Sequence, residues 1–82
     1  MITRSKPVET IRDGRIKATI WRNQGEKGAF FPVTFSRTYK DGEGNLQDGD
    51  SFTKTELLKV LRLADRAYDT VLGLEAAEKQ EA

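Results

Sequence analysis

Two segments of this chain alternate between hydrophobic and polar residues, which is the period-2 pattern of strands with one buried face. In residues 15–22, the apolar positions are Ile16, Ala18 and Ile20. Residues 30–40 continue the pattern, with Phe31, Val33, Phe35, Arg37 and Tyr39 on one face of the expected strand. The other face of both strands is polar, rich in hydroxyl groups and basic. We therefore expect an antiparallel pair with a buried apolar side.

Turn residues separate these segments from two weaker ones. Asp13-Gly14 predicts a tight turn between a short extended piece, residues 8–12, and the first strand. The polar residues 23–28 predict a loop, and Pro32 predicts an edge or a bulge because it donates no ladder hydrogen bond. A second turn at residues 41–45 leads to a weak fourth strand over residues 46–52. The first 52 residues thus predict four strands.

A long amphipathic helix follows the strands. Thr53 and Glu56 form a capping box, with Thr53 as the N-cap. Apolar residues then recur at helical spacing for more than four turns, and Gly73 is the expected C-cap. The helical stripe comprises Leu57, Val60, Leu61, Ala64, Ala67, Tyr68, Val71 and Leu72. Further leucines outside this stripe suggest a second partner surface, which self-association through the helix would supply.

These elements predict an α+β fold: a four-stranded antiparallel curved sheet followed by one long C-terminal amphipathic helix. Eighty-two residues allow one domain with a small core. We expect an N-terminal flexible arm over residues 1–7, the domain over residues 8–73, and an acidic flexible tail over residues 74–82.

Composition narrows the chemistry. The chain has no histidine and no cysteine, so a Ser–His or Cys–His nucleophile and a thiolate zinc site are excluded. Residues 41–48 contain several acids, but the pattern of an EF-hand is missing. We therefore predict no enzymatic activity, no cofactor, no metal and no small-molecule substrate. With no apolar run long enough for a membrane span and no signal peptide, we expect a cytoplasmic protein.

Charge is divided unevenly along the chain. Residues 1–40 carry nine Lys or Arg and three Asp or Glu, a net charge of +6, whereas residues 41–82 carry a net charge of −5. Cations interleaved with aromatic residues on strands are typical of surfaces that bind phosphates and stack bases. The expected nucleic-acid-binding residues are Arg15, Lys17, Thr19, Trp21, Arg22, Arg37 and Lys40. Two ordinary explanations remain open: the cations solubilise the strands, and Trp21 covers the edge of the core.

The chain also resembles the single-stranded-DNA-binding transcriptional coactivators of the positive cofactor four type. The matching positions are Arg37-Thr38-Tyr39, similar to an Arg-x-Tyr at the end of the family's third strand, then Gly44-Asn45-Leu46 and Asp48-Gly49. Asp50-Ser51 stands where the family has a basic pair. The resemblance implies a homodimer that packs through its helices and binds single-stranded DNA or RNA. The expected dimer residues are Leu58, Leu61, Leu63 and Tyr68.

A different class of function stays open at this point. A small protein-interaction module or inhibitor would use the acidic half of the chain. Its contacts would come from the turn and tail acids Asp41, Glu43, Asp48, Asp50, Glu75, Glu78 and Glu81. Charge reversal of Lys17 and Arg22 separates the two hypotheses, because only nucleic-acid binding needs those cations.

Overall fold

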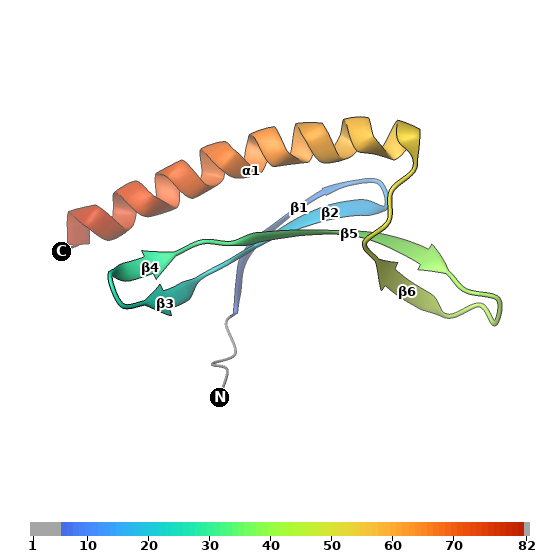
Figure 1. Ribbon diagram of the computed structural model, residues 1–82, viewed down its shortest axis with the longest axis horizontal. Coiled ribbons are helices and arrows are strands. Elements are labelled where there is room, and N and C mark those ends of the chain that lie inside the picture. The colour runs from blue at the N-terminus through green and yellow to red at the C-terminus, as the bar shows by residue number, and fades with distance from the viewer. Residues whose placement is uncertain (1–5, 82) are drawn as a thin grey trace.

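The predicted α+β class is confirmed by the computed structural model, which describes the backbone of residues 6–81 and the side chains of residues 6–79. Four strands form an antiparallel sheet in the order β1-β2-β5-β6, and one long helix follows them (Figure 1). The elements are β1 (Pro7–Asp13), β2 (Ile16–Trp21), β3 (Asn23–Gly25), β4 (Gly28–Phe30), β5 (Val33–Lys40), β6 (Leu46–Gly49) and α1 (Lys54–Glu81). Most of the predicted N-terminal arm, residues 1–5, lies outside the described residues, and Pro7 already belongs to β1.

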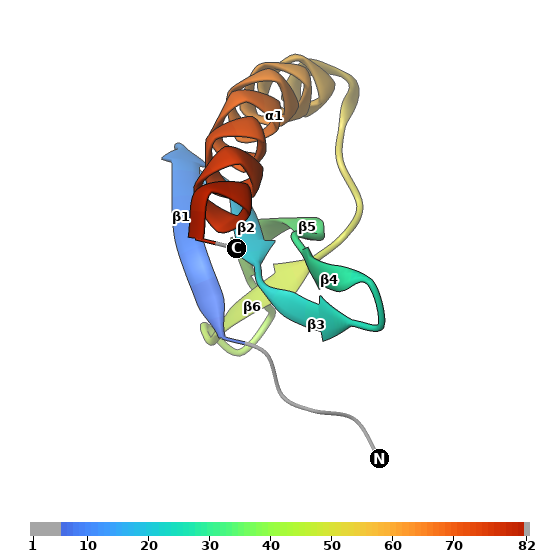
Figure 2. The same cartoon turned by 90° about the vertical axis from the view of Figure 1, so that its left-hand side faces the viewer.

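The sheet register places the apolar residues of three strands on one face. Ile11 of β1 lies opposite Ala18 of β2, which in turn lies opposite Phe35 of β5. Helix α1 crosses this face and packs mainly against β2 and β1 (Figure 2). Ile16 and Ile20 are completely enclosed between the helix and the sheet. Within the described residues, no helix lies on the opposite face of the sheet, where most side chains are partly or fully exposed and Thr19 is buried.

The polar loop predicted for residues 23–28 is instead a second small hairpin of β3 and β4. Gly25 and Gly28 pair at its turn, and Gly28 adopts a φ of 123°, which side-chain-bearing residues rarely adopt. Because Pro32 cannot donate a ladder hydrogen bond, the chain leaves β4 at Phe30 and resumes as β5 at Val33. The hairpin therefore extends the β2–β5 pair as a separate two-stranded sheet.

The capping box at the start of α1 is confirmed. Glu56 accepts a hydrogen bond from the Thr53 amide at 2.8 Å, and the Glu56 amide donates to the Thr53 hydroxyl at 3.4 Å. The predicted end at Gly73 is wrong, because the helix continues to Glu81. Leu74 packs against the core and Glu78 pairs with Arg22, so the residues after Gly73 are stabilised in helical form. Residues 74–81 are thus helical rather than a flexible tail.

The buried stripe of α1 also differs from the prediction. Leu63 is completely buried, so its assignment to a dimer surface is wrong: it belongs to the core of the single chain. Leu57, Leu61 and Tyr68, which the periodicity placed in the core stripe, are more than half exposed. The core stripe is rotated by about one residue and consists of Val60, Leu63, Ala67, Val71 and Leu74.

Candidate nucleic-acid interface

The helix-free face of the sheet, called the open face below, follows from the register. Thr10, Thr19 and Thr34 lie opposite one another on β1, β2 and β5, and Arg12, Lys17 and Ser36 form the next row. On β5 and β6, Thr38 faces Asp48 and Lys40 faces Leu46. Trp21 completes the face at the end of β2. The open face thus combines five hydroxyl groups and three cations with a single indole and a single carboxylate.

Trp21 lies on this face and is held there by a hydrogen bond. Its indole nitrogen, Nε1, donates to the hydroxyl oxygen of Thr34 at 3.0 Å. The ring is half-buried and is therefore fixed across the β2–β5 pair with part of its surface in solvent. Thr19, next to it on the same face, is only 9% exposed and contributes to the floor of the surface rather than to its rim. An indole fixed in this way is a platform on which a planar ring can stack.

Arg12 and Lys17 lie directly opposite each other on β1 and β2. Like charges in this arrangement repel, so an anion placed between them is favoured. On the side of Lys17 away from Arg12, the carboxylate of Asp48 on β6 lies 3.3 Å from the Lys17 ammonium and accepts a hydrogen bond from the Thr38 hydroxyl at 2.9 Å. The hydrogen bond from Thr38, followed by that from Lys17, holds the pKa of Asp48 below its usual value. Asp48 is therefore ionised at neutral pH.

The remaining predicted cations differ in their position. Lys40 lies on the open face, near the tip of the β5–β6 hairpin, and is exposed. Arg15 is exposed in the turn between β1 and β2, where Gly14 adopts a φ of 63°. Of the two, only Lys40 is placed on the open face by the strand register.

Arg22 and Arg37, in contrast, are directed to the helix side. Arg22 forms two hydrogen bonds with the carboxylate of Glu78 on α1, at 2.9 and 3.2 Å. Arg37 lies opposite Ile16 in the register, and its guanidinium donates to the Ser51 carbonyl at 3.0 Å. It also lies 3.5 Å from Glu56 and over the ring of Tyr39. The structure therefore does not bring these two arginines together with Lys17 and Trp21.

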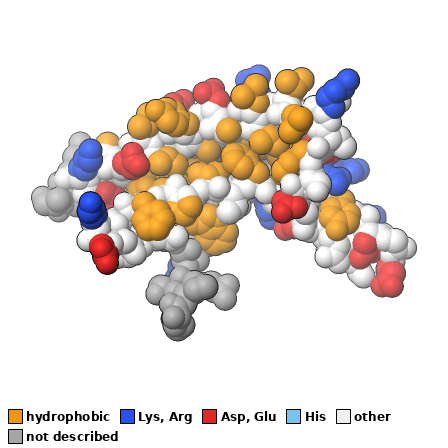
Figure 3. Space-filling model, in the orientation of Figure 1, with side chains coloured by type: hydrophobic (Ala, Val, Ile, Leu, Met, Phe, Trp, Pro, Cys, Tyr) orange, Lys and Arg blue, Asp and Glu red, His pale blue; other side chains and the backbone are white. Residues whose placement is uncertain are grey.

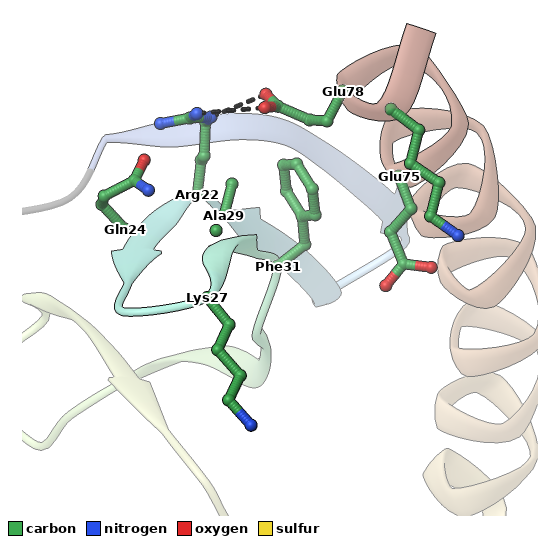
Figure 4. Close-up of a pocket in the computed structure, with 9 residues that line it drawn as sticks. Arg22, Gln24, Lys27, Ala29, Phe31, Glu75 and Glu78 are labelled. Atoms are coloured by element: carbon green, nitrogen blue, oxygen red, sulfur yellow. Dashed lines mark hydrogen bonds and ion pairs between the residues drawn. The ribbon is translucent and has the colours of Figure 1, made fainter. Parts of the chain in front are cut away.

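A hollow of about 490 Å³ lies between the C-terminal part of α1 and the β3–β4 hairpin (Figure 4). Its wall contains the Arg22–Glu78 pair, and its other charged groups are Lys27, Glu75 and Lys79. The hydrogen bonds to Arg22 lower the pKa of Glu78, which keeps this carboxylate ionised at neutral pH. Mixed charge at the rim makes this hollow a poor match for a polyanion.

A second surface is apolar. Because α1 packs mainly on β1 and β2, the apolar side of β5 is left partly uncovered. A groove of about 260 Å³ runs between β5 and α1, lined by Phe31, Val33, Phe35, Ala64, Ala67, Tyr68 and Val71. Leu57, Leu61 and Leu72 extend this surface along the helix, and we call the whole the apolar flank (Figure 3). Tyr68 at 65% and Leu61 at 63% are among its most exposed members.

The acidic turn has a structural role. One carboxylate oxygen of Asp41 accepts hydrogen bonds from the amides of Glu43 and Asn45, at 2.9 and 3.0 Å, and the other accepts one from Gln47. These bonds, that from Asn45 above all, lower the pKa of Asp41. Within residues 6–81, no group of three acidic side chains is placed to hold a metal ion. Over the same residues, no helix is long and apolar enough to cross a membrane.

Two charged residues of the open face were absent from the predicted site, Arg12 and Asp48. Arg12 could have been predicted from the sequence, because a tight turn at Gly14 makes residues 12 and 17 opposite partners in the β1–β2 pair. Asp48 gives no such signal, because its approach to Lys17 depends on how β6 pairs with β5. No protein-family model, curated protein or solved structure matches this chain.

Proposed function

We propose that this chain is a non-enzymatic protein that binds single-stranded DNA or RNA on the open face of its sheet. The observation that supports the proposal best is the separation of the two faces. One face is occupied by α1, whereas the other presents Arg12, Lys17 and Lys40 together with a fixed Trp21 farther along β2. Cations neutralise phosphates along a strand, and an aromatic ring stacks bases of any sequence. A transcription or replication accessory role, as in the coactivator family that the sequence resembles, is part of the proposal.

Unpaired strands fit this face better than a duplex does. Bases in a duplex are already stacked on their neighbours, so Trp21 has no free base to receive. The hydroxyl groups of Thr10, Thr34, Ser36 and Thr38 add short hydrogen-bonding groups that reach phosphate, sugar or base edges.

The experiment is fluorescence anisotropy of a labelled 20-nucleotide single strand and of the corresponding duplex, with Trp21 emission recorded in parallel. We expect binding of the single strand that is tighter than binding of the duplex, weakens with salt and quenches Trp21. Trp21→Ala should weaken binding about fivefold or more, since stacking one base contributes about 1–3 kcal/mol. Phe30→Ala is the control, because Phe30 is an exposed aromatic residue of the separate β3–β4 hairpin. Absence of binding at low salt contradicts the proposal.

We further propose that two copies of the chain pair through the apolar flank. Exposed leucine and tyrosine side chains beside an open apolar groove are typical of an interface. Leu61 and Tyr68 lie seven residues apart, on one side of α1, so one partner surface contacts both. Leu58 is equally exposed and lies three residues before Leu61, so it borders the same side of α1 and stays a predicted interface residue.

Light scattering after size-exclusion chromatography tests the pairing. The unmodified chain should have twice the mass of one copy, and Tyr68→Glu should reduce it to a single copy. Leu46→Glu is the matched control and should remain paired, because Leu46 is an exposed leucine on β6, away from the apolar flank. A single-copy mass for the unmodified chain at micromolar concentration contradicts this part of the proposal.

A further inference from the structure

Asp48 is the carboxylate that the register places on an otherwise cationic and hydroxyl-bearing open face. It is half exposed, with 51% of its side chain accessible, so a bound strand can reach its carboxylate. A negative charge here weakens the attraction of every phosphate that passes over the face. A favourable contact between Asp48 and the bases of the bound strand would offset this loss of attraction.

The surroundings of Asp48 orient its carboxylate. Thr38 donates to the oxygen Oδ1 at 2.9 Å, and Lys17 donates to the oxygen Oδ2 at 3.3 Å. A carboxylate has about four lone-pair sites, so each oxygen keeps accepting capacity on its solvent side. Two fixed oxygens with free acceptor sites match two parallel N–H donors.

We infer that Asp48 reads bases, and that it favours guanine over thymine in a bound single strand. The Watson–Crick edge of guanine offers two adjacent donors, N1–H and the N2 amino group, whereas thymine offers one N–H between two carbonyl oxygens. Those carbonyl oxygens meet the negative charge of Asp48 unfavourably. In single-stranded recognition, exposed base edges are read in this manner.

The spacing on the open face allows stacking and base reading to occur together. Trp21 lies four residues along β2 from Lys17, which corresponds to about 13 Å in an extended strand. A base stacked on Trp21 and a base above Asp48 thus belong to different nucleotides of one bound strand. The inference rests on the proposed function and adds a preference among bases to it.

The test compares three labelled 12-mers by anisotropy: all thymine, thymine with two separated guanines, and the same strand with inosine at the two guanine positions. Inosine keeps N1–H and lacks the N2 amino group. We expect the guanine strand to bind about fivefold or more tightly than the all-thymine strand, with inosine in between. Asp48→Asn should remove the difference, because its amide replaces one acceptor by a donor.

Asp50→Asn is the matched control, because it removes the same charge from an exposed residue just beyond β6. It should tighten binding of all three strands alike and preserve their ratio. A ratio near one for the unmodified chain, or a ratio that survives Asp48→Asn, overturns the inference while leaving the proposed function intact. Failure to bind any of the three strands at low salt overturns both.

Discussion

Lys40 offers the most direct quantitative test of phosphate binding. It is exposed on the open face, and none of the described ion pairs involves it. For single strands, the logarithm of the binding constant falls with the logarithm of salt concentration by about 0.7 for each phosphate that is neutralised. If Arg12, Lys17 and Lys40 each neutralise one phosphate, the slope is about −2.1 for each copy, and Lys40→Gln should reduce it to about −1.4.

These slopes translate into measurable affinities. Between 50 and 200 mM salt, binding should weaken about 18-fold for the unmodified chain and about sevenfold for Lys40→Gln. Anisotropy with a labelled all-thymine strand at five or six salt concentrations gives both slopes. Arg62→Gln, which removes an exposed cation from α1, should leave the slope unchanged. The reasoning is refuted if Lys40→Gln keeps the original slope, or if Arg62→Gln reduces it equally.

Three further predictions concern the fold. Leu63→Ala should lower the free energy of unfolding by about 2–5 kcal/mol in urea denaturation, because Leu63 is completely buried. Leu61 is exposed, so Leu61→Ala, measured at a concentration that favours single copies, should lower it by no more than about 0.5 kcal/mol. Equal losses for the two variants contradict the observed core stripe. Thr53→Ala should cost about 0.5–2 kcal/mol by removing the N-cap, and Thr55→Ala, which removes no described hydrogen bond, should cost clearly less. The pKa of Glu78 lies below its ordinary 4.5, so the Arg22–Glu78 pair stabilises the chain above about pH 4.5 and loses its effect as pH falls through the folded value. Glu78→Gln should therefore lower the melting temperature at pH 7 and have a progressively smaller effect as the pH is lowered below 4.5, and a difference that does not shrink at acidic pH refutes this role.

The local elements were predictable because their signals are local. Alternation identified β2 and β5, and Thr53 with Glu56 identified the start of α1. The β3–β4 hairpin was missed because three-residue strands with two glycines have the composition of a loop. The end of α1 was missed because one glycine costs only about 1 kcal/mol in a helix, and beyond it Leu74 packs against the core and Glu78 pairs with Arg22.

The candidate site was harder to predict, because a face of a sheet depends on pairing between distant segments. Alternation already placed Arg37 on the apolar side of its strand, and the structure shows that it holds the segment before α1 there. Arg22 follows the last residue of β2, where alternation no longer fixes direction, and it turns to Glu78. Leu63 was misassigned because several leucines fit helical spacing, and only the packing of α1 on β1 and β2 decides which stripe is covered.

Chemical-shift mapping of the ¹⁵N-labelled chain during titration with an unlabelled all-thymine strand tests the central claim most directly. The account predicts that the indole N–H of Trp21 and the amides of the open-face residues, such as Lys17 and Thr34, shift most. Amides in the middle of α1 should shift little at a constant degree of pairing between copies. Shifts concentrated on α1 and the apolar flank, or no shifts at low salt, would contradict the assignment of the open face as the nucleic-acid interface.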